Sequence, residues 1–221
     1  MSGFVLAIDG PAGSGKSSVA RAVAERLGMV DLNTGAAYRA VALLALREGV
    51  PADDGPALAR LARRVGLDAR GATIDGEPVP DPELRTPEVS ASASTVSAHP
   101  EVRRVLLEVQ REAARRAREE GGVVVEGRDI GTVVLPDAEV KIFLSASPEE
   151  RARRRAVQSG REAELERIRE AISRRDRRDS ERETSPLKPA PDAVILDTTA
   201  LDLEEVVLRV LEIACRRREG A

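Results

Sequence analysis

The amino-acid sequence predicts an α/β protein with a central, mostly parallel sheet flanked by helices. Three observations support this fold class. An apolar run, FVLAI at 4–8, is followed by a glycine-rich loop and then by a helical pattern. Strand and helix patterns alternate up to residue 49, as in doubly wound sheets. Apolar runs of the same kind return after residue 122, beyond a stretch that is richer in Gly, Pro and Asp.

The first 50 residues contain two strand–helix pairs. FVLAI is a continuous apolar run, which is typical of a strand buried on both faces. Apolar positions at helical spacing predict a helix over 16–27 that Gly28 ends. A second strand is expected at 29–33 and a second helix at 35–49.

The stretch 51–98 differs from its surroundings and is predicted to be an inserted subdomain. It begins with a short helix, PALARLARRVG, and continues as DARGATIDGEPV, where Asp75-Gly76 indicates a hairpin turn. A strongly amphipathic helix follows over 100–119, with Pro100 at its first position.

The last hundred residues return to the parallel α/β pattern. Strands are expected at 122–129, 140–147 and 193–199, and helices at 152–160, 162–179 and 203–218.

The composition narrows the function classes. The net charge of the 221 residues is −3 although 33% of them are charged, which argues against a dedicated nucleic-acid binder. No apolar run is long enough to span a membrane, and no signal peptide is recognisable. The single cysteine, Cys215, fits a reducing cytoplasm, and its apolar helical context predicts a buried structural thiol.

The stretch GPAGSGKS matches the phosphate-binding pattern G-x-x-x-x-G-K-[ST] in the required strand–loop–helix context. Converging backbone amides and the N-terminus of the helix favour an anion there. Lys16 is expected to reach the outer phosphates, and the Ser17 hydroxyl to bind Mg²⁺. The residues predicted to hold a nucleoside triphosphate are Gly10, Pro11, Ala12, Gly13, Ser14, Gly15, Lys16, Ser17 and Ser18.

The loop alone leaves the reaction open. A GTPase would need a base-reading NKxD-type segment, and the sequence has none. An ATPase would need a clear carboxylate after a strand, and VVVEGRD offers both Glu126 and Asp129. The chain length and the insertion favour a small kinase with a second, acceptor site.

Motifs along nearly the whole chain resemble the bacterial cytidylate kinase family. They are IDGPAGSGKSS, NTGAAYR, LRTPEV, EGRDIGTVVLPDAEVKIFLSAS and RRDRRDSERETSPLKPAPDAVILDT, in the order of that family. Some positions depart from its pattern. The DSG of the family appears here as Asn33-Thr34-Gly35, where Thr34 keeps the hydroxyl, and its DGRD appears as EGRD, where Glu126 keeps a carboxylate. Ser17 stands where several members have Gly.

The resemblance implies a P-loop kinase core over 1–50 and 99–221, with a lid at about 155–175 and a nucleoside-monophosphate-binding insertion at 51–98. It implies that ATP, with Mg²⁺, phosphorylates CMP and dCMP. Lid arginines of such kinases close over the ATP phosphates, a role that falls here to Arg154 and Arg155.

The resemblance also implies the residues of the acceptor site. Those expected to bind CMP are Thr34, Arg103 and Asp129 at the base, Arg175 and Asp179 at the sugar, and Arg39, Arg128 and Arg182 at the phosphate. Lys16, Arg128, Asp129 and Arg182 are expected to be catalytic. A carboxylate at Asp129 accepts a hydrogen bond from the amino group of cytosine, whereas the O4 atom of uracil would face it as a second acceptor.

Two other functions remain open at this stage. One is a related kinase for UMP, AMP or an alcohol; the other is a P-loop regulator or ATPase whose charged helices bind RNA or a partner. Tyr38 is either a packing residue or a wall of the acceptor pocket, and His99 has no expected role. The predicted partners are small molecules only, with no nucleic acid and no membrane, for a cytoplasmic monomer.

Overall fold

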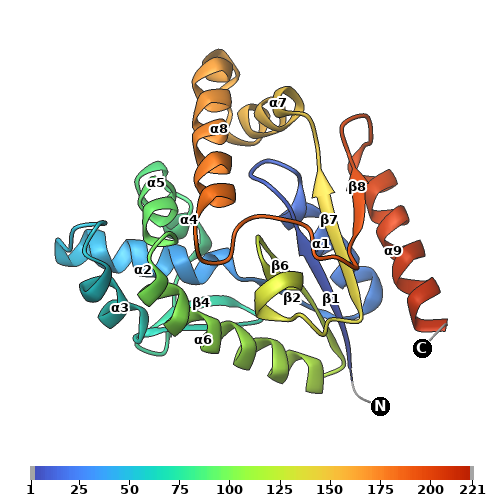
Figure 1. Cartoon of the computed structure of the whole chain (residues 1–221), viewed down its shortest axis with the longest axis horizontal. Helices are drawn as coiled ribbons and strands as arrows, with labels where there is room; N and C mark the ends of the chain where they lie inside the picture. Colours follow the sequence, from blue (N-terminus) through green and yellow to red (C-terminus); the bar gives the residue numbers. More distant parts are fainter. Residues whose placement is uncertain (1–2, 220–221) are drawn as a thin grey trace. The chain divides into compact units, whose positions relative to one another are not determined.

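The computed structural model describes residues 3–219, which fold into two compact units (Figure 1). One unit comprises residues 3–31 and 121–219, and the other comprises residues 32–120. Each unit has its own hydrophobic core. The predicted insertion, 51–98, lies entirely within the second unit.

The first unit is built on a parallel sheet, as the sequence predicts. The strands are β1 (Phe4–Asp9), β2 (Val30–Asn33, whose first half belongs to this unit), β6 (Gly122–Gly127), β7 (Val140–Ser145) and β8 (Val194–Asp197). Their order is β2-β6-β1-β7-β8, and β1 pairs in parallel with β6 and β7. The central strand, β1, is the buried apolar run FVLAI extended by Asp9.

The functional loops follow the carboxyl ends of neighbouring strands. Asp9 at the end of β1 stands opposite Gly127 at the end of β6. The glycine-rich loop follows β1, and the GRD segment follows β6 and leads into a π-type turn, η1 (Ile130–Val134). In open α/β sheets, this edge is where ligands bind.

Helices α1 (Lys16–Leu27) and α9 (Leu203–Glu219) share a core with the sheet. Gly28 ends α1 in the left-handed conformation, as predicted. In α9 the buried positions include Val206, Val210 and Ala214, whereas Cys215 is exposed. The prediction of a buried thiol was therefore wrong: Cys215 lies about 100° around the helix from Ala214 and so falls outside the buried face.

Helices α7 (Pro148–Ser159) and α8 (Leu165–Glu181) pack on each other beyond the end of β7 (Figure 1). A short 3₁₀ turn, η2 (Glu162–Glu164), joins them. Their shared core is small and includes Ala152, Ala156, Ile168 and Ile172.

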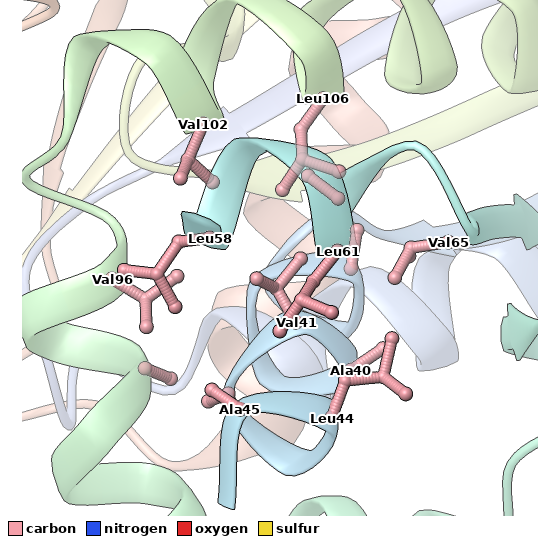
Figure 2. Close-up of a cluster of buried hydrophobic side chains, with 14 of the residues drawn as sticks. Ala40, Val41, Leu44, Ala45, Leu58, Leu61, Val65, Val96, Val102 and Leu106 are labelled. Carbon is pink, nitrogen blue, oxygen red and sulfur yellow. The ribbon is translucent and has the colours of Figure 1, made fainter. Parts of the chain in front are cut away.

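The second unit consists mainly of helices. Its elements are α2 (Gly35–Glu48), α3 (Gly55–Ala62), β3 (Val65–Asp68), β4 (Gly71–Ile74), β5 (Glu77–Pro78), α4 (Asp81–Leu84), α5 (Pro87–Val96) and α6 (Pro100–Glu119). Figure 2 shows how α2, α3, α5 and α6 direct Val41, Leu58, Val96 and Leu106 into one core.

The sequence predicted this unit only in part. The turn at Asp75-Gly76 forms as expected, with φ of 53° and 87°, between the antiparallel strands β4 and β5. Helices α4 and α5 were not predicted. The sequence of α5, PEVSASASTV, alternates small polar and apolar residues and carries little helical periodicity, so its packing against α2 decides its conformation.

Candidate functional site

The glycine-rich loop after β1 leaves no space for side chains at two of its positions. Gly10 has φ of 152°, and a Cβ there would lie 2.2 Å from the carbonyl oxygen of Leu144. Gly13 has φ of 78°, and its Cβ would lie 2.8 Å from the carbonyl oxygen of Arg151. The loop backbone is therefore packed tightly between the ends of β7 and α7, which fixes the direction of its amides.

The N-terminus of α1 is arranged to meet an anion. Gly15 at the N-cap is left-handed, and no side chain among the described residues caps the helix. Lys16 is buried, and its Nζ donates to the Pro11 carbonyl at 2.7 Å and to Ser14 Oγ at 3.3 Å. Burial, and then the nearby Arg128, lower the pKa of Lys16 well below its ordinary value. A phosphate next to Lys16 would reverse this shift.

Glu126 lies at the start of α1, and Asp31 is close enough to Glu126 to feel its charge. The Ser17 hydroxyl donates to Glu126 Oε2 at 2.9 Å, which joins the loop to the end of β6. Asp31 has a buried carboxylate oxygen, Oδ1, with no hydrogen-bond partner among the described residues. Burial and the negative charge of Glu126 raise the pKa of Asp31 to about 6. Hydroxyl and carboxylate oxygens are ligands suited to Mg²⁺.

A pair of charged residues from α7 and α8 holds the backbone of Ala12. The Ala12 amide donates to Asp176 Oδ1 at 3.2 Å, and Arg151 Nη1 donates to the Ala12 carbonyl at 3.0 Å. Arg151 also forms an ion pair with Asp176. We call Arg151 and Asp176 the loop brace. Neither residue was singled out in the sequence, because each falls within a run of charged helical positions.

The two arginines predicted to bind ATP have different surroundings. Arg154 donates to Glu150 Oε1, to Thr198 Oγ1 and to the Thr198 carbonyl. Its guanidinium lies beside Gly15 of the loop. Arg155 is exposed and donates to Gln158. The structure places Arg154 beside the phosphate loop, while the role of Arg155 stays a prediction.

Three predicted acceptor arginines of the first unit surround the carboxylate of a fourth predicted residue, Asp179. Asp179 is buried, and Arg128 Nε donates to its Oδ2 at 3.0 Å. Arg182 Nη1 lies 3.6 Å from Asp179 Oδ1, and Arg175 Nε lies 3.9 Å from Oδ2. Burial alone would raise the pKa of Asp179, but the three guanidinium groups together lower it. Three cations around one anion leave a net positive charge, which suits a phosphate.

Asp129 is buried in the first unit, directly after β6. The other three predicted residues, Thr34, Arg39 and Arg103, lie in the second unit. Thr34 is buried at the start of α2, and Arg39 Nη1 lies close to Gly35 on the same helix. Arg103 on α6 is buried and donates to the Ser97 carbonyl at 3.1 Å. Its guanidinium lies 5.4 Å from the centre of the Tyr38 ring. Tyr38 thus packs in the core and also supports Arg103 through a cation–π contact.

His99 has a structural place in the same unit. It precedes α6, and its Nε2 is hydrogen-bonded to the Ala52 carbonyl at 2.9 Å.

Comparison with known proteins decides the family. The family model described as "Cytidylate kinase" matches residues 6–216. The chain belongs to the cytidylate kinase family. The cytidylate kinase of Geobacter sulfurreducens is 47% identical over 99% of this chain and 95% of its own length. That of Geobacillus kaustophilus is 49% identical, with 96% of each chain covered.

A solved structure supports the fold independently. A gluconokinase from Sinorhizobium meliloti superposes with a TM-score of 0.53, at 18% identity, over 99% of this chain and 95% of its own. The P-loop α/β kinase fold that the sequence predicts is therefore confirmed. No helix within residues 3–219 is long and apolar enough to cross a membrane.

In this member of the cytidylate kinase family, sequence reasoning missed four polar residues: Asp9, Asp31, Arg151 and Asp176. Asp9 was taken only as the end of a strand, and Asp31 as part of one. Glu126 was left ambiguous, and its hydrogen bond to Ser17 now places it beside the phosphate loop. A polar residue inside or directly after an apolar strand is the one local signal that pointed to Asp9 and Asp31.

Proposed function

We propose that the protein transfers the γ-phosphoryl group of ATP to CMP and dCMP, giving ADP and the nucleoside diphosphates. The observation that carries the proposal is the positive cluster of Arg128, Arg175 and Arg182 in the same unit as the glycine-rich loop. A kinase whose acceptor is itself a phosphate must neutralise the repulsion between the two phosphates, and guanidinium groups do this.

On the donor side, the loop from Gly10 to Ser18 holds the triphosphate. Lys16 and the amides at the start of α1 stabilise the charge that develops on the transferred group. Arg154 contributes a further positive charge beside the loop. Arg155, the next residue of α7, is exposed and adds a second guanidinium to the triphosphate.

Mg²⁺ would be held by Ser17 and by the nucleotide phosphates, with Glu126 accepting hydrogen bonds from its water ligands. Among the described residues, no group of three or more His, Cys, Asp or Glu side chains can hold a metal. The ion therefore needs the phosphates as ligands, as is usual for Mg²⁺ in kinases. When bound, it neutralises charge on the phosphates.

On the acceptor side, cytosine is recognised by Asp129, Thr34 and Arg103. The sugar is bound by Arg175 and Asp179, and the phosphate is bound by Arg39, Arg128 and Arg182. Asp129 provides the choice of base because its carboxylate accepts from the amino group that cytosine has and uracil lacks. The protein acts on small molecules as a cytoplasmic monomer, and light scattering after gel filtration tests the monomeric state.

A coupled assay of ATP against CMP, dCMP, UMP, AMP and gluconate tests the proposal. We expect CMP and dCMP to give the highest kcat/KM, and we expect the kcat/KM for UMP to be lower by at least about a hundredfold. Hydrolysis of ATP without any acceptor, or a preference for AMP or gluconate, would reject it.

A further inference from the structure

Asp9, the last residue of β1, belongs neither to the phosphate loop nor to the acceptor cluster. Its side chain is 4% exposed, which is rare for a carboxylate. Asp9 Oδ1 accepts from the Ile130 amide at 2.8 Å, and Asp9 Oδ2 accepts from the Gly131 amide at 2.8 Å. Both carboxylate oxygens are thus used by two successive amides of the loop that follows β6.

Asp9 contacts the GRD segment at both of its ends. Asp9 is also the residue opposite Gly127 in the parallel pairing of β1 with β6. A single residue therefore fixes the GRD segment on both sides, at Gly127 by strand pairing and at Ile130 and Gly131 by its carboxylate. Only Arg128 and Asp129 lie between these two points.

The backbone of the GRD segment has an irregular conformation, which the hydrogen bonds of Asp9 help to hold. Asp129 has φ of −144° and ψ of 26°, outside both regular helix and strand. Directly after it, η1 is closed by wide-ring hydrogen bonds, among them the Leu135 amide to the Ile130 carbonyl at 2.7 Å. Turns of this kind are rare and are frequent at functional sites.

Keeping Asp9 ionised at this buried position costs free energy. Burial raises the pKa of Asp9 from 3.8 to about 6, and Asp129 adds to this, while the two backbone hydrogen bonds and Lys16 act in the opposite direction. Asp129 and Lys16 are the charged groups that face it. A neutral side chain would avoid this cost, but among side chains of this length only a carboxylate accepts from two parallel amides.

We propose that Asp9 is a positioning residue for base and phosphate recognition: its carboxylate holds the loop after β6 so that Arg128 and Asp129 face the acceptor nucleotide. Since Asp9 directly precedes Gly10, the same residue links the phosphate loop to the acceptor loop. This inference rests on the proposed roles of Arg128 and Asp129.

The test compares Asp9→Asn and Asp9→Glu with Asp197→Asn. Asp197 is a matched control, because it also ends a parallel strand and its carboxylate accepts from the amide of the following loop, at Thr199. In Asp9→Asn one acceptor oxygen becomes an NH₂ group that faces an amide donor. We expect the KM for CMP to rise at least about tenfold and the preference for CMP over UMP to fall about as much, with the KM for ATP changed less than about threefold.

The other two variants have defined outcomes. Asp9→Glu keeps both oxygens and should recover part of the lost preference for CMP. Asp197→Asn should leave the KM for CMP and the CMP-to-UMP ratio within about twofold of the wild type. If Asp9→Asn raises the KM for ATP and for CMP equally, or changes neither, the proposed role is rejected.

Amide hydrogen exchange on the full chain gives a readout that does not depend on activity. In Asp9→Asn we expect the amides of Ile130 and Gly131 to exchange at least about tenfold faster, with β1 itself unchanged. Unchanged exchange at both amides would overturn the inference even if CMP is the substrate. Faster exchange in a protein that prefers another acceptor would instead reject the proposed function and keep the positioning role.

Discussion

At the scale of single residues, the site depends on charges that the fold keeps away from water. Lys16, Asp9, Asp129 and Asp179 are all buried, and each lies in or beside the loops at the carboxyl ends of β1 and β6 or on α8. Burying a charge costs free energy unless partners offset the loss of water. Replacing such a residue should therefore lower activity, while its effect on the free energy of unfolding depends on how well partners offset the buried charge.

Replacement of Lys16 tests this separation. In Lys16→Met we expect kcat to fall at least about a hundredfold, because a fixed positive charge at the transferred phosphate is lost. Folding lowers the pKa of Lys16, so the unfolded chain holds that proton more tightly. The stability of the wild type relative to Lys16→Met should consequently rise with pH. Steady-state kinetics and urea unfolding at several pH values measure both; full activity in the variant would contradict the assignment of the loop.

Replacement of Asp129 tests base recognition. Asp129→Asn presents an amide, which can donate to the O4 atom of uracil. We expect the ratio of kcat/KM for CMP to that for UMP to fall by about a hundredfold. Parallel assays with the two monophosphates measure the ratio, and an unchanged ratio would remove Asp129 from base recognition.

Replacement of Arg182 tests the phosphate contact. Arg182→Ala removes one of the guanidinium groups around Asp179, so the KM for CMP should rise more than that for ATP, by about tenfold or more. Two-substrate kinetics give both constants. Equal losses would place Arg182 on the ATP side instead.

At the scale of elements, α7 and α8 support the phosphate loop through the loop brace, Arg151 and Asp176. Other ion pairs on α8 are exposed and lie within the helix, as between Arg169 and Glu166 and between Arg174 and Glu170. Such exposed pairs contribute little to stability, whereas loss of one partner of a buried pair leaves an uncompensated charge. Loss of the brace should therefore reach the phosphate loop, whereas loss of an exposed pair should not.

The brace can be tested against an exposed pair on the same helix. Asp176→Ala leaves Arg151 without its carboxylate and releases the Ala12 amide, so we expect a loss of about 3 kcal/mol in unfolding free energy and a higher KM for ATP. Glu170→Ala should cost less than about 0.5 kcal/mol and leave the KM unchanged. Urea unfolding and kinetics measure both variants, and equal effects would show that the brace is an ordinary surface pair.

At the scale of the whole molecule, stability should carry a pH dependence from Asp9. Its pKa is about 6 in the folded protein against an ordinary value of 3.8, so folding favours the protonated form. The resulting stabilisation is full below about pH 4 and is lost as the pH rises through 6. The shift of about two units corresponds to about 3 kcal/mol. Urea unfolding of the wild type and Asp9→Asn between pH 4 and 8 should show this difference; parallel curves would contradict it.

The sequence predicted those parts of the molecule that local chemistry dictates. The strand, loop and helix from Phe4 to Leu27 and the hairpin turn at Asp75-Gly76 follow from apolar periodicity and from the freedom of glycine. The arginine cluster around Asp179 was expected only through the family resemblance, because Arg128 and Asp179 are 51 residues apart. Helix α5 escaped prediction because packing, not periodicity, decides it, and Cys215 was wrongly predicted to be buried because its position beside the buried face of α9 was overlooked.

The amino-acid sequence is enough to predict a phosphate-binding loop and a mostly parallel α/β core, and it contains the motifs of the cytidylate kinase family. The tertiary structure shows what holds that loop: Glu126 contacts it from the end of β6, and Arg151 and Asp176 hold it from two helices, while Asp9 fixes the neighbouring loop after β6. Each of these contacts joins residues more than a hundred positions apart. No local pattern encodes such a contact, since it arises only when the sheet brings its strand ends together.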